Sequence, residues 1–226
     1  KGTVGVGLVE GFGAKVERLA LNLAAGATLS GRAPTDVGTA VDLQIPVIEA
    51  DVPGQGKVAM SFGTALQAGG NLRENSFSLD RLTVNVSDTI KVGVDAFVKN
   101  MGEGGFAFNT RVEPISIPRA LGLAPPGARA KMPPGMAVGG SVDTTIHVSG
   151  ELPPMAELQT LGKDLAKVFA LPVKFEVTQG FTGMSVGMPA ARLGVAGLNG
   201  AVRVSGTPGN ILIESPASRP LGIARI

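Results

Sequence analysis

The chain has 226 residues, of which 44% are hydrophobic and 17% are charged, and its formal net charge is +2. Such a chain can bury a sizeable apolar surface, which excludes a disordered protein. It contains no Cys, Trp or Tyr and one His, which excludes disulfides, thiol nucleophiles and cysteine-ligated metals, and argues against an aromatic platform for nucleic-acid bases. The 20 basic and 18 acidic residues are scattered without a basic run, so we expect no nucleic-acid partner.

The beginning of the chain is rich in glycine but does not form a nucleotide-binding motif. In residues 5–11 the third glycine comes one position late for a dinucleotide fingerprint, so we interpret these glycines as strand and turn residues. The most apolar stretch, residues 19–29, is too short to span a membrane. Because the chain begins at Lys1 and shows no signal-peptide pattern, we expect an excerpt of a longer protein or a processed chain, with any membrane anchor outside it.

Apolar and polar residues alternate with a period of two over residues 82–87, 91–96, 106–113 and 142–148. This period is typical of β-strands, and the many Val, Ile and Thr residues favour strands over helices. An antiparallel sheet with one wet face has this pattern, so we expect these strands to share one apolar surface. The residues predicted to line it are Val84, Val86, Val92, Val94, Phe106, Phe108, Val142, Ile146 and Val148.

Glycine clusters separate the alternating segments, at residues 68–71, 102–105, 139–140 and 206–210. Glycine adopts the positive φ angles that many tight turns need, so each cluster predicts a turn. Strand, turn and strand at this spacing predict a meander of antiparallel hairpins.

Two segments carry a helical pattern instead. Residues 117–123 predict a short turn of helix, closed by the Pro- and Gly-containing segment 124–127. Residues 153–172, bounded by prolines, predict an amphipathic helix of about four turns. Its apolar stripe consists of Met155, Leu158, Leu161, Leu165 and Val168. The stripe either packs on the sheet or docks on a membrane or partner, although the mixed charges opposite it differ from the Lys- and Arg-rich face of membrane-surface helices.

The predicted fold class is therefore mainly β: an elongated, curled antiparallel sheet that forms a groove, with one amphipathic helix and short helical turns. Three parts are expected. They are a larger sheet region over residues 1–152, the helix over residues 153–172, and a shorter set of strands over residues 173–226 that continues the same sheet.

The residue types offer no constellation for catalysis. His147 is the only histidine, and Asp143, its nearest acid on the same strand face, stands roughly 13 Å away at about 3.3 Å per residue. This separation is too long for a hydrogen bond within the strand, so we expect a solvent-facing histidine and no enzyme activity. The carboxylates match neither an EF-hand nor a catalytic dyad, and we expect no metal site and no cofactor. A hard-cation site built from distant carboxylates stays open at this stage.

The middle of the chain carries motifs in a defined order. Residues 79–94 hold two alternating segments, and residues 105–109 begin another. Residues 112–123 then run from a strand into the helical turn, residues 132–136 read Met-Pro-Pro-Gly-Met, and residues 140–143 open a further strand with Gly. This order of paired strands, helical turn, Pro–Gly segment and Gly-led strand resembles the repeats of the AsmA-like family of large bacterial envelope proteins. That family includes the TamB-like bridge lipid-transfer proteins.

The resemblance covers residues 71–150 best and residues 188–215 more weakly, and residues 191–202 resemble the start of a further repeat. The helix expected over residues 154–171 is not part of the repeat. The resemblance implies a periplasmic, curled β-sheet with a hydrophobic groove, tethered to the inner membrane by a segment not present here. It also implies lipid transport between membranes and outer-membrane biogenesis, with phospholipid-type acyl chains and envelope proteins as partners.

Alternation alone does not separate a lipid groove from the core of a closed sandwich, because both need apolar walls of Val, Leu, Ile, Ala and Met. The leading hypothesis is therefore a noncatalytic segment of a periplasmic lipid-transport or envelope-assembly protein. The alternative is a structural β-module, a sandwich belonging to a secretion- or pilus-type envelope assembly. An enzyme is the third reading.

Overall fold

The computed structural model describes residues 2–6, 9–11, 14–16, 19–30, 33–99, 104–151, 172–188 and 192–224. The strands are β1 (Gly2–Val6), β2 (Val9–Gly11), β3 (Ala14–Val16), β4 (Leu19–Ser30), β5 (Ala33–Val52), β6 (Gly56–Asn71), β7 (Ser76–Val86), β8 (Ile90–Val98), β9 (Gly105–Ser116), β10 (Ala137–Glu151), β11 (Val173–Met188), β12 (Leu193–Thr207) and β13 (Asn210–Glu214). Two short helices, α1 (Ile117–Gly122) and α2 (Pro126–Ala130), lie between β9 and β10. The protein is mainly β, as predicted.

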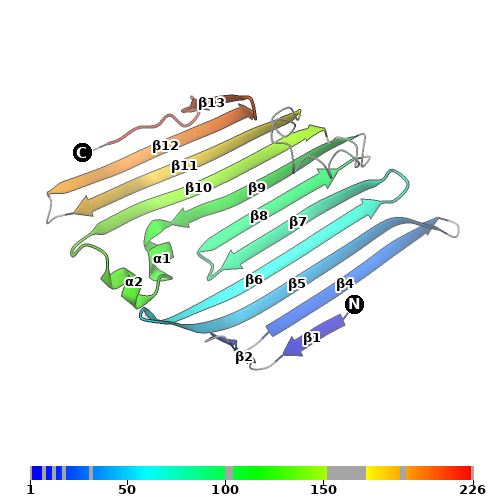
Figure 1. Ribbon diagram of the computed structural model, residues 1–226, viewed down its shortest axis with the longest axis horizontal. Helices are drawn as coiled ribbons and strands as arrows, with labels where there is room; N and C mark the ends of the chain where they lie inside the picture. Colours follow the sequence, from blue (N-terminus) through cyan, green and yellow to red (C-terminus); the bar gives the residue numbers. More distant parts are fainter. Residues whose placement is uncertain are drawn as a thin grey trace.

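All of the described strands belong to one antiparallel sheet, which is not closed (Figure 1). From β4 to β13 each strand pairs with the next one along the chain, and β1 pairs with β4. The short β3 pairs with β5, and β2 pairs with β3. β10 pairs with β11 from Ala137 to Gly150, so the strands before and after residues 152–171 lie in the same sheet. The amphipathic helix predicted over residues 153–172 falls, apart from Pro172, outside the described residues.

Short turns join the long strands, and local hydrogen bonds stabilise their unusual backbone angles. Gly54 adopts φ +70° between β5 and β6, where glycine has no steric penalty. Ser87 and Asp88 have φ of 51° and 50° in the turn between β7 and β8. The amide Nδ2 of Asn85 donates to Asp88 Oδ1 at 2.8 Å, and the backbone N–H of Ser61 donates to Ser87 Oγ at 3.1 Å. These bonds offset the cost of the left-handed angles at two residues that are not glycine.

The glycine turn predicted at residues 68–71 is wrong. These residues lie inside β6, and the chain reverses only at residues 72–75. Gly70 pairs with Phe77 of β7, and a Cβ atom on Gly70 would come within 2.7 Å of the Phe77 ring. Glycine at this position therefore makes room for an aromatic ring from the neighbouring strand.

The turn predicted at Gly139 and Gly140 is also wrong, because both residues lie inside β10. A β-bulge interrupts the pairing with β11 here, and Gly140 adopts φ +89°. A Cβ atom on Gly140 would stand 2.6 Å from the backbone of Gly183, so the close approach of two chains explains this glycine. By contrast, Pro208 and Gly209 do join β12 to β13, as predicted.

Helix α1 confirms the predicted helical turn, with Pro118 in its first turn, where the missing N–H of proline costs nothing. Helix α2 was not predicted. Its Gly127 N–H donates to the carbonyl oxygen of Gln55 at 2.7 Å, and a Cβ atom on Gly127 would lie 2.6 Å from the Gln55 Cα. The second helix is therefore held against the turn between β5 and β6, which is far from it in sequence.

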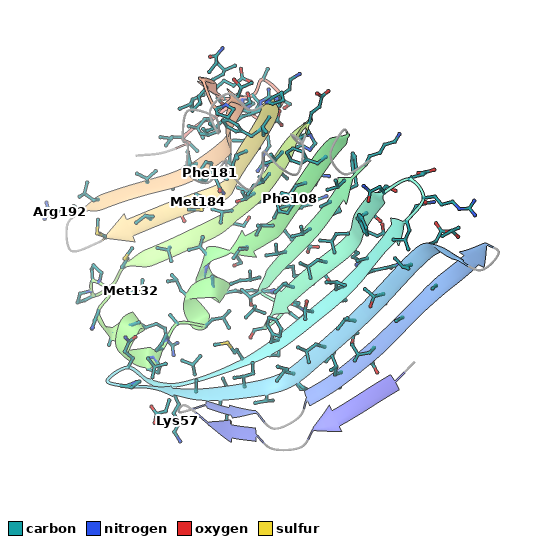
Figure 2. All side chains as sticks on the ribbon, turned by 45° about the vertical axis from the view of Figure 1, so that its right-hand side comes forward. Lys57, Phe108, Met132, Phe181, Met184 and Arg192 are labelled. Carbon is teal, nitrogen blue, oxygen red and sulfur yellow. The ribbon has the colours of Figure 1, made fainter. Side chains whose placement is uncertain are left out.

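The described part of the chain has almost no buried core. The buried apolar residues there are Val58, Ala107 and Ala201, and no large side chain is fully buried. Figure 2 shows side chains standing on a single layer of strands. The accessible surface of the chain is 14,296 Å², whereas a compact protein of 22.8 kDa exposes about 9,600 Å². A single sheet therefore leaves far more surface uncovered than a compact domain does.

Candidate functional site: the apolar face of the sheet

Strand register shows which residues share a face, because directly paired residues in antiparallel strands point to the same side. One row of paired positions crosses the sheet from β4 to β13 and holds one threonine among apolar residues. The row is Leu23, Val41, Leu66, Leu82, Val94, Thr110, Ile146, Val177, Val204 and Ile213. Nine strand spacings of about 4.8 Å give the row a length of about 43 Å.

Two neighbouring rows of paired positions also consist mainly of apolar residues, contain no charged residue, and lie on the same face. The first is Leu21, Leu43, Thr64, Val84, Val92, Val112, Thr144, Gln179 and Val202. The second is Ala25, Thr39, Ala68, Leu79, Ala96, Phe108, Val148, Phe175, Gly206 and Ile211. We call the side of the sheet that carries these three rows the apolar face.

The structure places all nine predicted lining residues on the apolar face. Six of them belong to the three rows. The other three are assigned to the apolar face because the residues that they pair with lie there. Val86 pairs with Ile90, Phe106 with Val98, and Val142 with Phe181. Phe108 is 38% exposed, and the other eight side chains are half-buried among their neighbours. Phe108 and Phe181 of this face are labelled in Figure 2.

Bulges keep the faces separate along the strands. Between β9 and β10, Thr144 lies opposite Val112 but Val142 lies opposite Ile115, so β9 holds one residue more than its partner over this interval. The extra residue moves Ile115 onto the apolar face, where a regular strand would place Pro114 opposite Val142. Without this bulge the side chains that follow in β9 would change faces.

The opposite face, which we call the polar face, carries the charges. Every charged side chain described at a paired strand position lies there. These residues are Asp36, Asp42, Glu49, Asp51, Lys57, Arg81, Lys91, Asp95, Arg111, Asp143, Glu151, Lys174, Glu176, Arg203 and Glu214. At the paired positions, charged side chains are therefore absent from one side of the described sheet and frequent on the other.

Short-range polar contacts link neighbouring strands on the polar face. Arg203 contacts Glu214 at 2.8 Å and Glu176 at 3.5 Å. His147 is exposed, and its Nδ1 contacts Asn109 Oδ1, while Asn109 Nδ2 donates to Asp95 at 2.6 Å. His147 thus lies in a chain of surface hydrogen bonds between strands.

An ion pair that was not predicted from the sequence joins the segment after β13 to the polar face of β10. Arg219 donates from both terminal nitrogens to the Asp143 carboxylate at 3.0 Å, across 76 residues of sequence. The hydrogen bond to Asp143 raises the pKa of Arg219 above its ordinary value, although partial burial opposes the shift. A Cβ atom on Gly180 would lie 2.3 Å from the guanidinium, so glycine leaves room for it. No local pattern near either residue signals this pairing.

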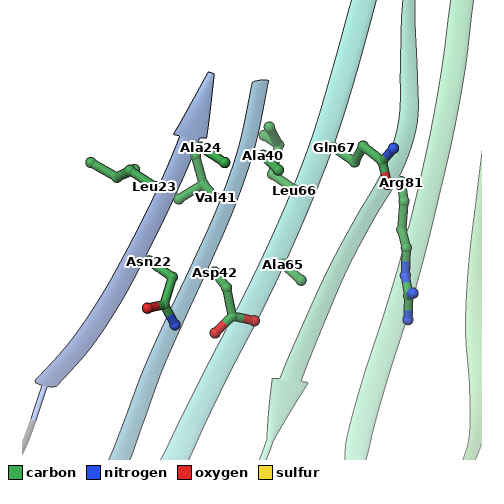
Figure 3. A pocket seen from close by; sticks show the side chains of 10 residues that line it. All are labelled: Asn22, Leu23, Ala24, Ala40, Val41, Asp42, Ala65, Leu66, Gln67 and Arg81. Atoms are coloured by element: carbon green, nitrogen blue, oxygen red, sulfur yellow. The ribbon is translucent and has the colours of Figure 1, made fainter. Parts of the chain in front are cut away.

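A shallow depression of about 370 Å³ also lies on the polar face (Figure 3). Asn22, Asp42, Gln67 and Arg81 supply its polar groups, and small alanine side chains between them leave the space. Figure 3 shows Asn22 and Asp42 pointing to the same side of their strands. The depression is open to solvent, and its charged groups are of opposite sign, which fits a hydrated surface.

Within the described ranges, no three His, Asp or Glu side chains come together in a way that would hold a metal ion. Among those same residues, no helix has the length and hydrophobicity needed to cross a bilayer. Comparison of the chain with protein-family models, with curated proteins and with solved structures finds no match in any of the three. The apolar face is therefore the feature on which we base the functional argument.

Proposed function

We propose that this chain is a noncatalytic, lipid-carrying segment of a periplasmic lipid-transport or envelope-assembly protein, and that its apolar face curls into a groove for acyl chains. The observation that carries the proposal is the uncharged face that runs across the strands from β4 to β13 with no described layer over it. Lipid tails need apolar walls without specific polar partners, and each buried methylene contributes about 0.8 kcal/mol.

The dimensions of the apolar face suit acyl chains. A bilayer core of about 30 Å holds two opposed acyl layers, so one chain spans about 15 Å. The central row, at about 43 Å, is about three times that length. Chains can therefore lie end to end across the strands, which is the arrangement that passage of lipid along a sheet requires.

Two polar side chains of the apolar face, Thr144 and Gln179, make hydrogen bonds within the protein itself. Thr144 donates to Gln179 Oε1 at 2.7 Å, and Gln179 Nε2 donates to the backbone carbonyl of Asp143 at 2.8 Å. A polar side chain with its hydrogen bonds already made does not need water, so a hydrocarbon chain can cover it at low cost. These two residues are thus compatible with a lipid-covered surface.

The alternative function is a structural β-module whose apolar face is covered by another protein layer. The observation in its favour is the same uncovered face, since a second sheet would bury it as in a sandwich. The two functions differ in what occupies the face: lipid in one and protein in the other.

Native mass spectrometry of gently purified protein tests the proposal. We expect masses raised by one or more phospholipids, and we expect Val94→Asp to lose them because it places a charge in the central row. Thr83→Asp, which adds the same charge to the polar face beside Gly93, is the matched control and should keep the lipid. A lipid-free mass for the unaltered chain, together with a Val94→Asp variant that cannot fold, would reject the groove and favour the structural module.

A further inference from the structure

Strand β13 forms an outer edge of the sheet and exposes three consecutive apolar side chains. Ile211, Leu212 and Ile213 are 57%, 55% and 69% exposed. Ile211 and Ile213 end two rows of the apolar face, while Leu212 lies on the polar face opposite Ser205. An edge strand also presents unpaired backbone N–H and C=O groups, which are a template for another strand.

The part of the edge next to β13, at Asn199 and Ala201 of β12, is covered by the chain itself. After β13 the chain returns along β12, where Ala201 N–H donates to the Arg219 carbonyl at 2.8 Å and Asn199 pairs with Gly222. Pro216 and Pro220 flank that return, and proline blocks strand pairing because it lacks an N–H. β13 has neither a proline nor a lysine, the residues that commonly protect an edge.

The sequence of β13 is self-complementary. It reads Asn-Ile-Leu-Ile-Glu, with an isoleucine on each side of Leu212 and a polar residue at each end. We propose that β13 pairs antiparallel with β13 of a second copy of this chain, centred on Leu212. This register places Ile211 opposite the second copy's Ile213, and Asn210 opposite its Glu214, so no like charges face each other.

The pairing also keeps the two faces of the sheet consistent. Residues 211 and 213 of both copies fall on the apolar face, and residues 210, 212 and 214 fall on the polar face. Arg203 holds Glu214 at 2.8 Å, which neutralises the acid at the end of the strand. The joined sheets would thus form one apolar face from two copies, whether or not that face binds lipid.

The contact is small. Five residues from each copy bury less than the roughly 800 Å² per partner that is typical of a stable complex. We therefore expect a weak, concentration-dependent association, which is best detected by covalent trapping. The chain contains no cysteine, so a single introduced thiol has no competing partner.

The test is disulfide trapping of the full chain carrying Leu212→Cys. In the proposed register the two introduced thiols lie directly opposite each other, within the separation that a disulfide spans. Under mild oxidation we expect most of the protein to become a covalent dimer on a non-reducing gel. The control is Leu193→Cys, at a side chain that is 61% exposed on β12, and we expect it to form at least fivefold less dimer.

A second measurement keeps the proposal falsifiable if the cysteine variant folds poorly. Sedimentation of the unaltered chain should show self-association that rises with concentration and is lost in Ile213→Lys, which places a charge at the edge. A folded Leu212→Cys protein that stays monomeric would overturn the proposal. Equal trapping at positions 212 and 193 would also overturn it, because random collision would then explain both dimers. The exposed edge of β13 would in that case be available to a strand of a different protein.

Discussion

The two faces of this sheet are built from alternate residues of the same strands, yet they are completed in different ways. The polar face carries the charged side chains of the paired positions, forms ion pairs between strands, and is closed at one corner by Arg219 and Asp143. The apolar face has neither charge nor a covering segment among the described residues. The comparison teaches that side chains of the polar face find partners on neighbouring strands, whereas no described segment of the chain covers the apolar face.

The largest expected effect comes from a charge on the apolar face. Ile146→Asp should weaken binding of a fluorescent acyl-chain probe by at least about tenfold, since a carboxylate in hydrocarbon costs about 2.5 kcal/mol or more. Thr145→Asp places the same residue on the polar face of the same strand and should bind as the unaltered chain does. Circular dichroism should show β-sheet in both variants. Equal binding by the two variants would contradict the difference between the faces.

The next effect concerns the bulge that keeps the two faces apart along β10 and β11. Gly140→Ala should lower the free energy of unfolding by about 2 kcal/mol, because it adds backbone strain and a clash with Gly183. Gly183→Ala is the matched control: Gly183 has φ +58° but no atom within 4 Å of an added Cβ. Gly183→Ala should lower the free energy of unfolding by only about 1 kcal/mol. Urea denaturation measures both, and equal costs would show that the close approach is unimportant.

Much of this contrast between the faces follows from local sequence. The alternation of apolar and polar residues can be recognised within a single strand. It therefore predicted which side chains share a face even without knowledge of how the strands pair. The glycine turns at residues 68–71 and 139–140 were predicted wrongly, because a ring from the next strand or a bulge requires glycine as much as a turn does. The pair of Asp143 and Arg219 was missed, since only the folded sheet brings the two residues together. The docking of α2 was missed for the same reason.

A smaller effect is expected from the corner of the polar face. Arg219→Ala should lower the free energy of unfolding by about 0.5–1 kcal/mol at low salt, and less in high salt, because the pair is partly exposed. The raised pKa of Arg219 means that its contribution is present below the ordinary arginine pKa and is lost only at more alkaline pH. Thermal melts should therefore show no pH dependence from this arginine near neutrality. Arg219→Lys should restore only part of the loss, because lysine cannot form both bonds.

The smallest effect is expected at His147. His147→Ala should change the free energy of unfolding by less than about 0.5 kcal/mol, because the side chain is exposed on the polar face. Acyl-chain binding should be unchanged as well. A complete loss of cellular function with the fold intact would reopen an enzymatic reading of this chain.

The central claim is that acyl chains lie on the apolar face, and the aromatic residues allow a direct test. The chain has no Trp or Tyr, so one introduced tryptophan reports on a single place. Phe108 on the apolar face and Phe97 on the polar face are 38% and 50% exposed, which makes Phe108→Trp and Phe97→Trp a matched pair.

The deciding measurement is quenching of each tryptophan by phospholipids with brominated acyl chains. Bromine quenches only at short range, so strong quenching of the Phe108→Trp protein and little quenching of the Phe97→Trp protein is the result that we predict. Equal quenching of the two, or none in either, would contradict the account.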